Sequence, residues 1–213
     1  MKDEELIRLT SDHRVFAVVR APSAQSALRA AEAAIIGGIK LVEVALSTPG
    51  SFRVISDLRH RYGDRAAIGA GSVMSLDQID RAIKGSAQFI SMSHTDQKLV
   101  QACRNRNIPP IIGALTPTEV AAAWAVGTPL VSLFPAAPMG GPEYLKALTS
   151  RIPDVRLVVA GGVGPEKIVD YFAAGAFAIA VGSRLFAQGD LQLENYTAIA
   201  ERARGIIRLA GVA

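Results

Sequence analysis

Residues 156–183, RLVVAGGVGPEKIVDYFAAGAFAIAVGS, contain two short apolar runs separated by a segment that opens with glycines and a proline. Apolar runs of this length without polar alternation are typical of strands that are covered on both faces. A proline near 165 is typical of the first turn of a helix. This stretch therefore predicts a strand, a helix and a second strand, which together form the repeating unit of a parallel α/β fold.

The same pattern continues along the rest of the chain. The apolar runs that predict strands cover 15–20, 40–46, 66–73, 88–93, 109–115, 129–136, 156–162 and 177–183. Helical patterns lie between them; in TPTEVAAAWAVG (116–127) a threonine, a proline and a first-turn glutamate predict the start of a helix. Eight such repeats, preceded by an extra N-terminal helix near 3–10, predict a single-domain (β/α)8 TIM barrel over residues 1–213.

An open, doubly wound sheet is the alternative arrangement of the same units. That fold usually carries a G-x-G-x-x-G dinucleotide fingerprint after its first strand, whereas this chain reads VVRAPSAQS at 18–26. The barrel is therefore the favoured prediction. In such a barrel the active site lies at the carboxyl ends of the strands.

Composition and charge exclude several classes of protein. The net charge is +4, but the basic residues are scattered and aromatic residues make up only 6%, so no nucleic-acid partner is expected. A mild positive field does suit small anionic metabolites. Cys103 is the only cysteine, which fits a reducing compartment. Because no signal peptide and no apolar run of about 18 residues is present, we expect a cytoplasmic protein without a membrane segment.

Glu43 and Arg20 are the first candidate site residues. Glu43 is a lone carboxylate in the apolar run LVEVAL (41–46), where burial of a charge is costly. It either points outward to an arginine or points into the barrel as an acid/base whose pKa burial raises. Arg20 ends the first predicted strand, where it either binds a substrate carboxylate or pairs with Glu43.

Two glycine-rich segments follow the last two predicted strands. Gly161 and Gly162 end the seventh strand, and Gly182 and Ser183 end the eighth. Loops at these two places often bind phosphate in barrels, because small residues expose backbone N–H groups. We therefore expect a site for phosphate or a similar anion here.

Three other polar side chains are weaker candidates. Ser72 follows the third strand in GAGSV (69–73) and either binds substrate or only forms a turn. His94 follows the fourth strand in SMSHTD (91–96), where it is either an acid/base or simply solvated. Ser132 is the one polar residue within the sixth strand, in LVSLFPAAPMGG (130–141). Because Glu43 and His94 are the only obvious metal ligands, we expect no metal and no other cofactor.

At this point the motifs resemble those of a known family. LVEVALST, GAGSV, GALTPTEV, LFPA…GG, AGGV and VGS occur in the order and spacing of the KDPG/KHG (2-keto-3-deoxy-6-phosphogluconate / 4-hydroxy-2-oxoglutarate) aldolases, from about Val15 to Phe186. The resemblance implies a homotrimeric barrel that needs no metal and cleaves a 2-oxo acid to pyruvate and an aldehyde. The resemblance also implies roles for individual residues. Glu43 is expected to be the acid/base, and Arg20 is expected to bind the substrate carboxylate. Phosphate is expected to bind at Gly161, Gly162, Gly182 and Ser183, and Phe134 and Pro135 are expected to contact the site.

The chain departs from the family pattern at several positions. Ser132 stands where the family has its Schiff-base lysine, and Ser47 stands where an arginine is expected. SMSHTD replaces the usual Ser-Pro-Gly, and Ser72 replaces a threonine. A serine forms only a hemiketal with a ketone, which is no comparable electron sink for cleaving a carbon–carbon bond. The six lysines are predicted away from the inward strand positions: Lys2, Lys40, Lys84, Lys98, Lys146 and Lys167.

Three hypotheses remain open from the sequence. The first is an enzyme of lyase type acting on a 2-oxo acid or sugar phosphate, with Glu43 transferring protons and Ser132 or His94 assisting. The second is a barrel without catalysis that binds a phosphorylated metabolite or a protein partner. The third is another phosphate-binding barrel enzyme, such as an isomerase or decarboxylase, although the extra acidic or basic residue that it needs at a strand end is missing.

Overall fold

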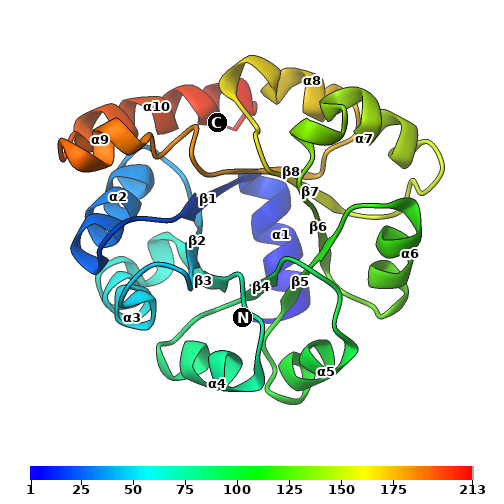
Figure 1. The fold of residues 1–213 in the computed structure, drawn as a ribbon, viewed down its shortest axis with the longest axis horizontal. Coiled ribbons are helices and arrows are strands. Elements are labelled where there is room, and N and C mark those ends of the chain that lie inside the picture. The colour runs from blue at the N-terminus through cyan, green and yellow to red at the C-terminus, as the bar shows by residue number, and fades with distance from the viewer. Residues whose placement is uncertain (213) are drawn as a thin grey trace.

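In the computed structural model, which describes residues 1–212 apart from the side chain of Asp64, eight parallel strands form a closed barrel (Figure 1). Each strand pairs with its neighbours in chain order, and the eighth pairs with the first. The strands are β1 (Val15–Val19), β2 (Leu41–Ala45), β3 (Ala67–Gly71), β4 (Ile90–Met92), β5 (Pro110–Ala114), β6 (Leu130–Leu133), β7 (Leu157–Ala160) and β8 (Ala178–Val181). The predicted (β/α)8 barrel is confirmed, and the open sheet is wrong.

Helices surround the barrel on its outer side (Figure 1). The α-helices are α1 (Asp3–His13), α2 (Ala24–Ile36), α3 (Ser51–Tyr62), α4 (Leu76–Lys84), α5 (Gln97–Asn105), α6 (Pro117–Ala125), α7 (Gly141–Thr149), α8 (Ile168–Ala173), α9 (Gln188–Gln192) and α10 (Tyr196–Leu209), with 3-10 turns η1 (Gly63–Arg65), η2 (Ala137–Met139) and η3 (Pro165–Lys167). No helix within residues 1–212 is long and apolar enough to cross a membrane.

Local sequence explains where individual helices begin. At α6 the Thr116 side chain accepts a hydrogen bond from the Glu119 backbone, and the Glu119 carboxylate accepts one from the Thr116 backbone. This reciprocal cap, followed by Pro117, is the predicted helix start. After β7 the proline starts a 3-10 turn, and the α-helix begins only at Ile168, three residues later than the sequence suggests.

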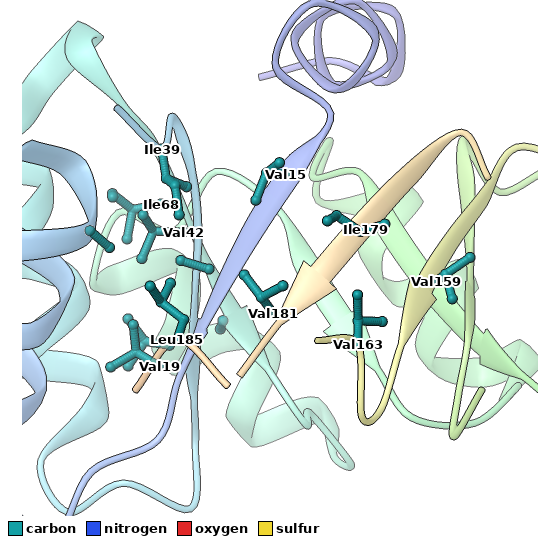
Figure 2. Close-up of a cluster of buried hydrophobic side chains, with 14 of the residues drawn as sticks. Val15, Val19, Ile39, Val42, Ile68, Val159, Val163, Ile179, Val181 and Leu185 are labelled. Carbon is teal, nitrogen blue, oxygen red and sulfur yellow. The ribbon is translucent and has the colours of Figure 1, made fainter. Parts of the chain in front are cut away.

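Strand alternation divides the core into two parts. Outward side chains such as Val15, Val19 and Ile179 pack between the barrel and the helices (Figure 2). Inward side chains such as Phe16 and Leu41 form a second cluster inside the barrel. Because a strand's side chains alternate between its faces, one apolar run supplies both clusters.

The extra N-terminal helix closes one end of the barrel. In the view down the barrel, α1 lies across the central opening (Figure 1). Leu6 of α1 is fully buried in the inner cluster with Phe16 and Leu41, near the amino ends of β1 and β2. The amino-terminal end of the barrel is therefore blocked, which leaves the carboxyl ends of the strands as the accessible end.

Candidate active site

A cavity of about 840 Å³ opens at the carboxyl ends of the strands. The residues of the candidate site that line it are Arg20, Glu43, Ser72, Ser132, Phe134, Gly161, Gly162, Gly182 and Ser183. Pro135 is not among these lining residues, and its contact with the site stays a prediction. It lies against the backbone of Gly161, where an added Cβ would approach the Pro135 Cα to 2.8 Å.

Glu43 points into the barrel from β2. Its neighbours Val42 and Val44 are buried on the helix side, so the alternation of the strand turns Glu43 inward, and the outward alternative is wrong. On the adjacent strand β3, a Cβ at Gly71 would overlap the Glu43 carboxyl group. The absence of a side chain at Gly71 therefore lets this carboxyl group lie across β3 and reach Ser91 on β4, with which it is hydrogen-bonded.

The surroundings of Glu43 change its acidity. Burial raises the pKa of its carboxyl group from an ordinary value of 4.5 to about 7, while the Ser91 hydrogen bond and the charge of Arg20 lower the pKa by smaller amounts. Residue Glu43 as a whole is half-buried, and the part of it that is exposed faces the cavity. A group with a pKa near neutrality can both take up and release a proton at physiological pH.

Ser132 lies on the opposite side of the cavity from Glu43. In a closed barrel of eight strands, β6 is four strands away from β2 in either direction, so their inward residues face each other. Ser132 pairs in register with Gly113 on β5 and Val158 on β7. Because Gly113 has no side chain and Val158 is apolar, the Ser132 hydroxyl is the polar group of this wall.

Two arginines carry positive charge at the carboxyl ends of β1 and β8. Arg20 follows β1 and Arg184 follows β8, and these two strands are paired. Both arginines are exposed at the rim of the cavity and line it. Among the ion pairs of the described residues, none involves either arginine. The two guanidinium groups are therefore available to an anionic ligand.

The predicted glycine-rich segments border the same part of the cavity. Gly161 and Gly162 have φ angles of +87° and +83°, a left-handed region that side chains other than glycine rarely occupy. An added Cβ at Gly162 would also approach that of Ala137 to 2.7 Å. The backbone here thus turns closely past the β6–α7 connection, with its peptide groups at the cavity wall.

The short helix α9 completes the wall beside Ser183. Gln188, Leu191 and Gln192 of this helix line the cavity. The helix is held in place by Arg202 of α10, whose guanidinium lies 2.7 Å from the Asp190 carboxylate and also donates to the Leu185 carbonyl. The side-chain amides of Gln188 and Gln192 therefore lie next to the arginines at the rim of the cavity.

Other candidates lie elsewhere. His94 is not among the residues that line the cavity; it belongs to the loop whose backbone crosses β5 at Gly113. All six lysines lie in the described part of the chain and none lines the cavity; Lys167, for example, pairs with Asp170 at 3.2 Å. In the described residues, no cluster of three or more His, Cys, Asp or Glu side chains could hold a metal ion.

Sequence reasoning missed Ser91, Arg184 and α9. Arg184 directly follows the predicted Gly182-Ser183 pair, and that adjacency was a usable signal. Ser91 carried no such signal, because its importance depends on Glu43 crossing Gly71. The five residues of α9 are too few to show helical periodicity.

Fold and site together define a class of protein. A closed (β/α)8 barrel that is blocked at its amino-terminal end and carries an acid and two arginines at its open mouth has the arrangement of barrel enzymes. A family model described as KDPG and KHG aldolase matches residues 6–202. The chain therefore belongs to this aldolase family, as the resemblance implied.

Individual relatives agree with this assignment. The chain is 30% identical over 176 residues to a 2-dehydro-3-deoxy-6-phosphogalactonate aldolase of Escherichia coli, covering 82% of this chain and 85% of the relative. It is 27% identical to a 2-dehydro-3-deoxy-phosphogluconate aldolase of Treponema pallidum, covering 93% and 94%. Among solved structures, the KDPG aldolase of Legionella pneumophila, with pyruvate captured as a covalent carbinolamine, matches with a TM-score of 0.86 at 26% identity, covering 94% of this chain and 97% of that one.

Proposed function

We propose that this protein binds an anionic 2-oxo acid in the barrel cavity, and that Glu43 moves a proton at the carbon next to the ketone without an imine being formed. The observation that carries the proposal is the position of Glu43: it faces the cavity, lies over Gly71 and is held by Ser91. A carboxyl group with a pKa of about 7 is suited to this transfer.

The rim of the cavity favours an anion. Arg20 and Arg184 present two unpaired guanidinium groups, which bind carboxylate or phosphate oxygens in two-point fashion. The segments at Gly161-Gly162 and Gly182-Ser183 bring backbone close to the same space. The ligand's carboxylate is proposed to lie at this rim, and a phosphorylated acid would place its phosphate at the two glycine-rich segments.

The proposed step conserves atoms and charge. The ionised Glu43 carboxylate takes a proton from carbon 3 of the 2-oxo acid, and the electron pair of the broken C–H bond forms the C2–C3 double bond. The ketone oxygen becomes an enolate oxygen, which accepts a hydrogen bond from the Ser132 hydroxyl across the cavity. Returning the proton from Glu43 to carbon 3 restores the acid, so the group acts in both directions.

An imine route is not supported by the residues around the cavity. Ser132 holds the position that the resemblance assigns to the Schiff-base lysine, and none of the six lysines lines the cavity. The relatives are aldolases, and cleavage of a 2-oxo acid to pyruvate and an aldehyde stays a prediction for this chain. Without an amine, such cleavage lacks its usual electron sink.

Hydrogen exchange tests the proposal directly. In D2O, the wild-type protein is expected to exchange the carbon-3 protons of 2-oxo acids, with and without a phosphate group, as followed by proton NMR. Glu43→Gln is expected to lose this exchange, and Glu143→Gln, at an exposed position on α7, is the matched control. Exchange by the wild type no faster than by Glu43→Gln would overturn the assignment of Glu43.

Borohydride trapping tests the absence of an imine. Incubation with pyruvate and borohydride is expected to leave the wild-type mass unchanged. A covalent adduct on any of the six lysines would refute this part of the proposal. Release of pyruvate from a panel of phosphorylated 2-oxo acids, measured in parallel, decides whether cleavage also occurs.

A second candidate is a binding protein without turnover, acting on a phosphorylated metabolite or a protein partner. It is favoured by Ser132 and by Ser47, which stands where the resemblance expects an arginine. Thermal stabilisation by a 2-oxo acid or sugar phosphate without proton exchange would select this candidate. The homotrimer and the cytoplasmic location stay predictions, which size-exclusion chromatography with light scattering and cell fractionation test.

A further inference from the structure

The floor of the cavity is apolar, in contrast to its rim. Below the inward residues Glu43 and Ser132, the cavity reaches Phe16, Ile111 and Val158, which are no more than 3% exposed. These three side chains belong to the inner cluster that α1 covers from the other side. The floor is therefore a hydrocarbon surface without a polar side chain.

Small side chains give access to this floor. The inward positions Ala160 on β7 and Ala180 on β8 line the cavity, and each carries only a methyl group. Ser132 adds only a hydroxymethyl group on β6. A long side chain at position 132 would extend into the middle of the barrel, above Ile111 and Val158.

The positions of the polar side chains around the cavity determine which end of a ligand should be polar and which apolar. The polar side chains are at the level of Glu43, Ser91 and Ser132 or nearer the mouth, where Arg20 and Arg184 lie. A hydroxyl group of the ligand at the floor would lose its hydrogen bonds to water and find no side-chain partner, which is unfavourable. An apolar group placed there is favoured by its removal from water.

The volume supports the same conclusion. A cavity of about 840 Å³ lies toward the upper end of the range for small-molecule sites, roughly 300–1,000 Å³. Pyruvate, with a single methyl group, would fill only part of this volume. The mouth near Gln188 and the floor near Phe16 both border the cavity, so it accommodates a ligand longer than pyruvate.

We propose that the ligand is a 2-oxo acid with an unbranched apolar chain, whose carboxylate lies at the Arg20–Arg184 rim and whose chain inserts past Glu43 and Ser132 onto the floor formed by Phe16, Ile111 and Val158. This inference rests on the proposed function and narrows it to one substrate class. A hydroxyl group that reaches the floor itself is disfavoured, because Phe16, Ile111 and Val158 offer it no hydrogen-bond partner.

A series of acids tests the chain-length dependence. Titration calorimetry of the wild-type protein with pyruvate, 2-oxobutanoate, 2-oxopentanoate and 2-oxohexanoate is expected to show the dissociation constant falling about fourfold for each added methylene. The heat-capacity change of binding is expected to become more negative along the series. A dissociation constant that is flat or rises along the series overturns the inference, while binding of pyruvate itself would leave the proposed function standing.

Variants locate the effect at the floor. Ala180→Leu fills the passage to the floor and is expected to abolish the gain from longer chains, whereas Ala121→Leu, the same change at an exposed position of α6, is expected to keep it. If Ala180→Leu does not fold, as judged by circular dichroism, Val158→Thr replaces it, because it puts a hydroxyl on the floor at nearly the same volume. An unchanged chain-length dependence in a folded floor variant refutes the inference.

Acids without the ketone separate this inference from the proposed function. Butanoate, pentanoate and hexanoate present the same chains. If these acids bind with the chain-length dependence and the 2-oxo acids do not bind better, the apolar floor is supported and the 2-oxo acid function fails. If neither series binds, both are overturned.

Discussion

The acidity of Glu43 predicts how the stability of the protein depends on pH. A carboxyl group whose pKa is about 7 in the folded protein and near 4.5 in the unfolded chain binds more protons when folded. Between these two values, the free energy of unfolding therefore falls as the pH rises. The stability contributed by the protonated group is fully present below about pH 4.5 and is lost as the pH passes 7.

The magnitude follows from the size of the shift. A difference of about 2.5 pKa units corresponds to roughly 3 kcal/mol, at about 1.4 kcal/mol for each unit. Since the carboxyl group faces a cavity open to water, part of its charge is screened, and we expect about 2 kcal/mol. Glutamine at position 43 keeps the shape and does not ionise, so the Glu43→Gln variant should lack this loss.

Urea unfolding followed by circular dichroism at pH 4, 6 and 8 measures the difference. Relative to Glu43→Gln, the wild type should lose about 2 kcal/mol between pH 4 and pH 8, which is close to 1 M in the urea midpoint for a chain of this size. Glu143→Gln should follow the wild type at every pH. A difference between wild type and Glu43→Gln that stays constant within about 0.5 kcal/mol would refute the burial of a titrating Glu43.

Other substitutions test the contacts around Glu43 and the core. Ser91→Ala removes a hydrogen bond that lowers the Glu43 pKa, so the pH at which stability is lost should move upward, at a cost of about 1 kcal/mol in the ionised state; an unmoved midpoint would contradict the contact. Gly71→Ala places a methyl group on the Glu43 carboxyl group, so proton exchange should be lost and stability should fall by about 1–3 kcal/mol; an active variant would contradict the geometry. Ser132→Lys should permit borohydride trapping of pyruvate, and failure of a folded variant to trap would show that more than the amine is missing. Cys103 is fully buried and burial raises the pKa of its thiol to about 12, so a thiol reagent at pH 8 should label it only in denaturant.

The barrel was predictable from the sequence because its strands are covered on both faces. Each apolar run carries residues for the inner and outer clusters together, so eight runs mark eight strands. The strand ends were harder to predict, since Arg20 and Phe134 belong to the predicted runs but lie beyond the last residues of β1 and β6. Pairing depends on the neighbouring strand, which a run of residues does not reveal.

The candidate site was predictable only where a residue breaks a local pattern. Glu43 and Ser132 are polar side chains in apolar strands, and both line the cavity. Phe134 lines the cavity, whereas Pro135, the next residue in the same motif, is not among the lining residues although both lie against Gly161. Ser91 was not predictable, because its role depends on a glycine of another strand that lets a carboxyl group pass over it.

Helix α1, which blocks the amino-terminal end of the barrel, also determines how ligands enter and leave the site. With Leu6 buried in the same cluster as Phe16, the amino-terminal end is closed, and Arg20 and Arg184 border the mouth at the other end. A ligand must leave by the path along which it entered. If one bound molecule is converted into two, the fragment at the floor departs only after the fragment at the rim, so release is ordered and an excess of the rim fragment should trap its companion inside.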